Sequence, residues 1–268
     1  MKMKSLLISG LIIVFCFLRC GTDEKNFHQI PIKGYALLIG MNDVNDAYYG
    51  TGKDYHNALN DIKGFQRILN RTNSYTNIEV KDSLDTRWCD IVSSVQNLQN
   101  ITRRNPYGSY VFILFSGHGF LENDEQFLCL RDRMVHKNEI RKLLEGFNER
   151  TKVYMVINSC HSGEYGYPVI LPSDIYKKRY ASFYKSVITR YSKYEFRGKA
   201  SVCYTSATDK YGKAPRPVYS YEKSPFIQKY LDQWGDSYSS VGYGNFKLTT
   251  YERNDRSFFL KTYPLIFK

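Results

Sequence analysis

The segment Tyr110-Val-Phe-Ile-Leu-Phe-Ser-Gly-His-Gly119 joins a strongly apolar run to a polar turn. Five of its first six residues are β-branched or aromatic, and such side chains favour a β-strand. A strand that is apolar along its whole length is typical of a parallel sheet covered on both faces. We therefore expect a central buried strand at residues 110–115, with His118 in a glycine-flanked turn directly after it.

A second segment has the same construction, because the apolar run at residues 153–157 leads into the turn Asn158-Ser-Cys-His-Ser-Gly163. Other apolar runs bounded by turn residues predict further strands. The predicted strands are residues 35–39, 78–81, 200–204 and 257–261, with a small hairpin arm at 126–130. Apolar residues spaced three and four apart predict helices. The predicted helices are residues 54–70, a helix from near Asp85 or Thr86 past Ile101, residues 137–147 and residues 225–234.

Strands that alternate with helices predict an α/β fold, a mainly parallel sheet flanked by helices on both faces. A hydrophobic content of 43% and an aromatic content of 16% exclude a disordered or fibrous chain. In parallel sheets, ligands bind beyond the carboxyl ends of the strands. We therefore expect the turns that carry His118 and Cys160 to project from the same edge.

The residues of these two turns suit nucleophilic catalysis. A cysteine nucleophile needs a base to form its thiolate, and donors for the oxyanion that develops when it attacks a carbonyl group. We predict Cys160 as the nucleophile and His118 as its partner. The backbone N–H groups of Cys160 and Gly119 are the predicted oxyanion donors.

These motifs resemble those of the clan CD cysteine peptidases, specifically the caspase and metacaspase branch, peptidase family C14. Leu114–Gly119 looks like the histidine motif and Ile157–Gly163 like the cysteine motif. Their separation of 42 residues also suits a family whose histidine lies roughly 50 residues upstream. The resemblance covers about residues 34–262. It implies a caspase-like fold and a cysteine endopeptidase that acts on peptide or protein substrates without a cofactor.

The resemblance also implies a substrate-binding pocket formed by Asp61, Ser116 and Asn158. In metacaspases the residue two before the catalytic cysteine is an acid, which binds a basic P1 side chain together with an acid of the first helix. Here that residue is Asn158, whereas Asp61 and Ser116 match the family pattern. We therefore expect cleavage after Arg or Lys.

The N-terminus predicts export. Lys2 and Lys4 precede an apolar run at residues 6–18, and no acid occurs before Asp23, which is typical of a signal segment. The run is shorter than the roughly 20 apolar residues of a membrane-spanning helix. Cys20 lies where a lipoprotein signal has its lipidated cysteine, so the chain is expected to be a membrane-anchored lipoprotein or a secreted or periplasmic protein.

The predicted organisation is an export signal at 1–20, a polar tether at 21–33 and a peptidase domain at 34–268. Two other functions stay open, a caspase-like domain that binds partners without cleaving them and a binding lipoprotein of the cell envelope. The net charge of +12 accompanies no nucleic-acid-reading motif, so no nucleic-acid partner is expected.

The remaining cysteines do not form a pattern of their own that predicts a site. Cys89, Cys129 and Cys203 lie within or beside apolar runs, where a free cysteine is usually a small buried hydrophobe. A metal site formed by His118, Cys160 and His161 would have three ligands, whereas structural zinc takes four. No metal is therefore expected.

Overall fold

The computed structural model describes residues 33–42, 57–71, 75–82, 86–163, 195–208, 210–214, 219, 221–228, 231 and 249–252. Within these ranges, no helix is long and apolar enough to cross a membrane. The predicted export signal with Cys20, the predicted tether up to residue 32 and the strand predicted at 257–261 lie outside the described residues.

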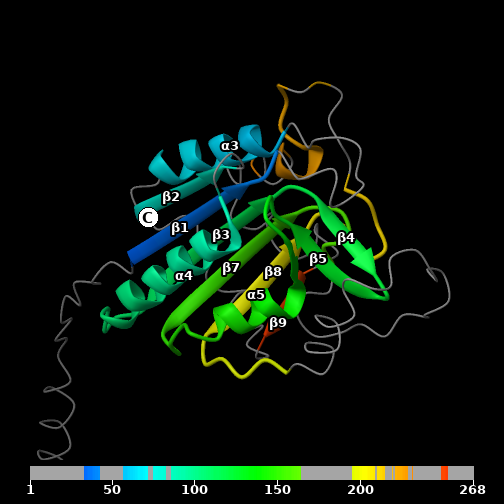
Figure 1. The fold of residues 1–268 in the computed structure, drawn as a ribbon. Helices are drawn as coiled ribbons and strands as arrows, with labels where there is room; N and C mark the ends of the chain where they lie inside the picture. Colours follow the sequence, from blue (N-terminus) through cyan, green and yellow to red (C-terminus); the bar gives the residue numbers. More distant parts are fainter. Residues whose placement is uncertain are drawn as a thin grey trace, which may run out of the picture. The chain divides into compact units, whose positions relative to one another are not determined.

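The centre of the fold is a six-stranded sheet (Figure 1). In spatial order its strands are β2 (Tyr75–Asp82), β1 (Lys33–Gly40), β3 (Ser109–Ser116), β7 (Thr151–Asn158), β8 (Ser201–Ser206) and β9 (Thr249–Glu252). The first five are parallel, and β9 pairs antiparallel with β8. The prediction of a mainly parallel sheet is confirmed, although β9 was not predicted.

Helices cover both faces of this sheet. The helix α3 (Ala58–Arg71) packs on one face, and α4 (Trp88–Arg103) and α5 (Lys137–Leu144) pack on the other. Residues 225–228 and 231 are also helical, and they pack on the α3 face. The predicted α/β class with two covered faces is therefore confirmed.

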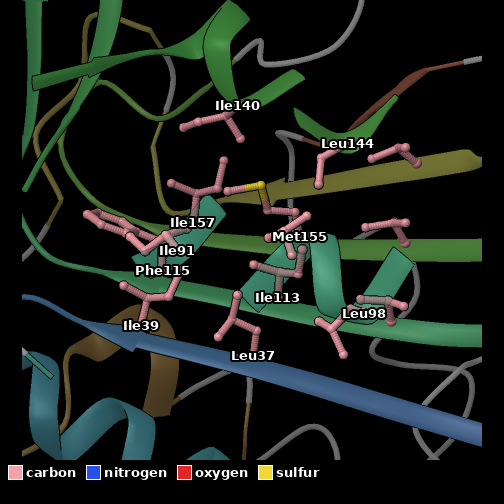
Figure 2. Packing of buried hydrophobic residues seen from close by; sticks show 14 of the residues in the cluster. Leu37, Ile39, Ile91, Leu98, Ile113, Phe115, Ile140, Leu144, Met155 and Ile157 are labelled. Carbon is pink, nitrogen blue, oxygen red and sulfur yellow. The ribbon is translucent and has the colours of Figure 1, made fainter. Parts of the chain in front are cut away.

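The central strands are buried because successive side chains alternate between two apolar clusters. Leu37 and Ile39 of β1 point into the cluster under α4 and α5, whereas Ala36 and Leu38 point into the cluster under α3. Figure 2 shows the first cluster, in which Ile140 and Leu144 of α5 lie over Met155 and Ile157 of β7. A strand apolar on both faces fits only between two helical layers, which explains the uninterrupted apolar runs.

The start of α4 differs from the predicted one. The residue that caps the helix is Arg87 rather than Asp85 or Thr86. Its backbone N–H donates to the Asp90 carboxylate at 2.8 Å, and the Trp88 N–H donates to the Asp132 carboxylate at 3.2 Å. Carboxylates satisfy the exposed N–H groups of a helix start. Asp132 lies 44 residues downstream, so the local pattern could not reveal it.

A small antiparallel sheet follows the His118 turn. Its strands are β4 (Gly119–Glu122), β5 (Glu125–Cys129) and β6 (Met134–His136), with β5 in the middle. Asn123 and Asp124 connect β4 to β5 with φ values of 47° and 68°, the left-handed backbone that a tight hairpin turn requires. The hairpin arm predicted at 126–130 is confirmed as β5.

Two Val→Ala variants test the buried sheet. Val111 of β3 is fully buried, whereas Val80 of β2 is 38% exposed. We expect Val111→Ala to lower the free energy of unfolding by about 2 kcal/mol, since it loses buried methyl groups and leaves a cavity. Val80→Ala should cost less than about 1 kcal/mol. Urea unfolding followed by circular dichroism measures both, and equal losses would contradict the two-layer core.

Candidate active site

The turns with His118 and Cys160 begin at neighbouring strand ends. The strands β3 and β7 pair in parallel, and their last paired residues are Ser116 and Asn158. The Gly117 N–H extends this pairing by donating to the Asn158 carbonyl at 3.1 Å. His118 and Cys160 are each two residues beyond the pair, so the structure brings the two turns together at one sheet edge.

Gly119 packs directly against the backbone of Cys160. A side chain at this position would overlap the Cys160 carbonyl oxygen and approach the Ser159 hydroxyl, so only glycine fits. The His118 carbonyl accepts the Cys129 N–H at 3.0 Å, which fixes the backbone before Gly119 to β5. The two predicted oxyanion donors therefore lie on segments in contact.

The residue after Cys160 has an unusual backbone conformation. His161 has φ = 54°, a left-handed value that is uncommon for a residue with a side chain. Its N–H donates to the Gly212 carbonyl at 2.9 Å. Its Nδ1 lies 3.0 Å from the Lys210 carbonyl oxygen, so this nitrogen carries the proton. The segment after β8 thus holds the Cys160 turn from one side.

The three predicted pocket residues form one buried cluster beneath the turns. The Asp61 Oδ2 atom accepts from the Ser116 hydroxyl at 2.6 Å and from the Asn158 amide at 2.9 Å. Ser224, which was not predicted, donates its N–H to Asp61 Oδ1 at 2.8 Å and its hydroxyl to Oδ2 at 3.0 Å. All four residues are essentially inaccessible to solvent.

Ser224 lies 163 residues after Asp61, so sequence spacing could not connect the two. The only local signal is Ser224-Pro225, a pair that often starts a helix. Helical residues do follow it at 225–228. That signal marks a helix start and carries no information about a pocket.

Burial governs the charge of the pocket. Loss of solvent raises the pKa of Asp61 to about 6, because it outweighs the opposing hydrogen bonds from Ser116, Ser224 and Asn158. Asp61 is therefore mostly ionised at neutral pH and mostly protonated below pH 6. At neutral pH the cluster carries a negative charge that four hydrogen bonds stabilise.

The described cysteines differ in accessibility. Cys129 and Cys203 are buried, as predicted, and burial raises the pKa of Cys203 to about 12. Cys89 is exposed, so its predicted core position is wrong. It lies in the first turn of α4, where Trp88 and Ile91 pack on the core and Cys89 does not. Cys160 is half-buried at the sheet edge.

Side chains of the types that bind metals are dispersed in the part of the chain that the structure describes. There, no three side chains of His, Cys, Asp or Glu are grouped so that they could hold an ion. His161 also uses its Nδ1 atom on the Lys210 carbonyl.

Comparisons with known proteins show the family of the chain. The family model of the caspase domain, Peptidase_C14, matches residues 33–244. Metacaspase-1 from Plasmodium falciparum (isolate 3D7) is 27% identical over 173 residues. That alignment covers 53% of this chain and 26% of the relative, so the chain spans about a quarter of its length.

A solved structure shows the same fold. The crystal structure of protein GSU0716 from Geobacter sulfurreducens has a TM-score of 0.61 at 20% identity, covering 87% of this chain and 98% of that one. Caspase-1 from Spodoptera frugiperda has a TM-score of 0.43 at 12% identity, covering 76% of this chain and 68% of that one. Because the family model spans most of the chain, the protein belongs to the caspase domain family, peptidase C14, and resembles caspases and metacaspases.

Proposed function

We propose that the protein is a cysteine endopeptidase in which Cys160 is the nucleophile and His118 its acid–base partner. The register of β3 and β7 carries the proposal, because it puts the two turns on neighbouring strand ends. Membership of a peptidase family supports the same chemistry and implies protein or peptide substrates.

The proposed reaction has two stages. His118 takes the thiol proton of Cys160, and the thiolate sulfur attacks the peptide carbonyl carbon. The N–H groups of Cys160 and Gly119 stabilise the oxyanion that forms. As the C–N bond breaks, His118 gives its proton to the departing amine and a thioester remains on Cys160. Water loses a proton to His118, attacks the thioester carbon and releases the acid, and the sulfur regains its proton.

The cluster below the turns is the proposed P1 pocket, with selectivity for Arg or Lys. Asp61 supplies the negative charge, and charge-assisted hydrogen bonds are stronger than neutral ones. The Asp61 Oδ1 atom accepts the Ser224 N–H, and a carboxylate oxygen can accept a second hydrogen bond. Because Asp61 is fully buried, a basic side chain reaches it only when residues that cover it move.

Removal of the nucleophile tests the reaction. Cys160→Ala should abolish hydrolysis of fluorogenic peptides. His118→Ala should lower kcat by about two orders of magnitude or more, because acid–base help is lost. Cys89→Ala is the matched control, since it removes an exposed thiol outside the site, and should keep wild-type kcat. Full hydrolysis by Cys160→Ala would refute the peptidase proposal, and binding without hydrolysis by wild type would favour a non-catalytic domain.

A comparison of Arg with its uncharged analogue citrulline at P1 tests the pocket. Asp61 is charged above its pKa of about 6, so the ratio of kcat/KM for Arg over citrulline should fall as the pH drops from 7.5 to 5. Effects of pH on the reacting groups act on both substrates and cancel in the ratio. Asp61→Asn should make the ratio small and independent of pH. A wild-type ratio that is unchanged over this range, or a preference for Asp at P1, would contradict the assignment.

We also propose that the chain is exported and that Cys20 is lipidated after removal of residues 1–19. The basic residues and apolar run before Cys20 support this. The wild-type protein should sediment with membranes and show the mass of a lipid on its first residue. Cys20→Ser should move it to the soluble fraction. A mature protein that begins at another residue and has no lipid mass would refute lipidation and favour secretion without an anchor.

A further inference from the structure

Gln126 is a buried side chain of β5 that bonds to the turn after Cys160. Its side-chain amide nitrogen donates to the His161 carbonyl at 2.7 Å and also to the Gly163 carbonyl. Its side-chain oxygen accepts from Lys137 Nζ at 3.3 Å. Gln126 is entirely inaccessible to solvent, so these bonds are shielded from competition by water.

The same strand also bonds to the His118 turn. At its end, Cys129 donates its N–H to the His118 carbonyl at 3.0 Å. The strand β4, which starts at Gly119, pairs with β5 so that Gly119 lies opposite Leu128 and Leu121 lies opposite Gln126. One strand thus connects both turns, through its backbone to His118 and through the Gln126 side chain to the segment after Cys160.

The Cys160 turn needs such restraint because of its conformation. A left-handed residue with a side chain, such as His161, costs of order 1 kcal/mol or more and persists only where its surroundings hold it. The segment after β8 holds the N–H and the ring of His161, whereas Gln126 holds its carbonyl. Without Gln126, the carbonyl groups of His161 and Gly163 would lose this donor.

We propose that Gln126 is a positioning residue that fixes the Cys160 turn relative to Gly119, so that the N–H groups of both residues converge on one oxyanion. This role rests on the proposed peptidase function. Gln126 contacts neither of the two reacting side chains in any of the hydrogen bonds above. It acts through residues 161 and 163. Its loss raises the free energy of the transition state, in which the oxyanion carries its charge.

The variant Gln126→Met tests this role, because methionine has a similar length and shape but no donor. We expect kcat to fall about 10-fold to 100-fold with KM within twofold, because removing one oxyanion donor typically costs about 10²-fold to 10³-fold and misalignment costs somewhat less. Gln126→Asn retracts the amide by one methylene group and should lower kcat in the same direction. It also serves as the test if Gln126→Met does not fold.

Gln99→Met is the matched control. Gln99 is also a buried glutamine, and it belongs to α4. Its amide nitrogen donates to the Leu143 carbonyl of α5 at 2.6 Å. The same chemical change there should lower the melting temperature and leave kcat within twofold of wild type. Equal kcat in Gln99→Met and Gln126→Met would overturn the proposal.

Alkylation by iodoacetamide separates positioning from general damage. The reaction needs the Cys160 thiolate but forms no oxyanion, so its rate at Cys160 in Gln126→Met should stay within about twofold of wild type. Exposed Cys89 provides an internal reference in the same digest. A parallel fall of alkylation and kcat would show a merely structural role and overturn the proposal. A wild-type chain without any peptide hydrolysis would instead refute the proposed function itself.

Discussion

The rest of the site depends on the parallel pairing of β3 and β7 in one register, with Ser116 opposite Asn158. In a sheet covered on both faces, the apolar residues of each strand point alternately into two clusters, so a slip by one residue would move these side chains to the other cluster. The core therefore fixes the register very strongly. Because each turn starts a set number of residues after the pair, the same register fixes His118 and Cys160 relative to each other.

The core cannot hold the turns themselves, because they lie beyond the last apolar residues. Their backbone groups need other partners, and segments distant in sequence supply them. The strand β5 bonds to both turns, and the segment after β8 bonds to His161. Without such bonds a left-handed His161 would relax to an ordinary turn. The precision of the site thus comes from hydrogen bonds, whereas its location comes from apolar packing.

This division explains what the sequence could predict. Long apolar runs predict the buried strands, and regular apolar spacing predicts the helices. The parallel sheet then predicts that the two turns lie at the same edge. No such pattern predicts the edge strand β9, because Thr249–Glu252 is short. No pattern predicts the bond from Asp132 to the start of α4 either, because Asp132 lies in a distant segment. Ser224 was missed for the same reason. The family resemblance predicts the other three members of the buried cluster, Asp61, Ser116 and Asn158. The roles assigned to them stay predictions.

Compared with an aspartate at the same position, Asn158 changes the charge of the cluster and hardly changes its size. Its amide lies 2.9 Å from the Asp61 carboxylate. A second carboxylate at that separation would share a proton with Asp61, since two such charges cannot both ionise readily. The amide instead donates a hydrogen bond, which opposes the effect of burial on the pKa of Asp61. Asp61 therefore carries its own charge at neutral pH, and a cluster with an amide at position 158 has one carboxylate that titrates in a single step near pH 6.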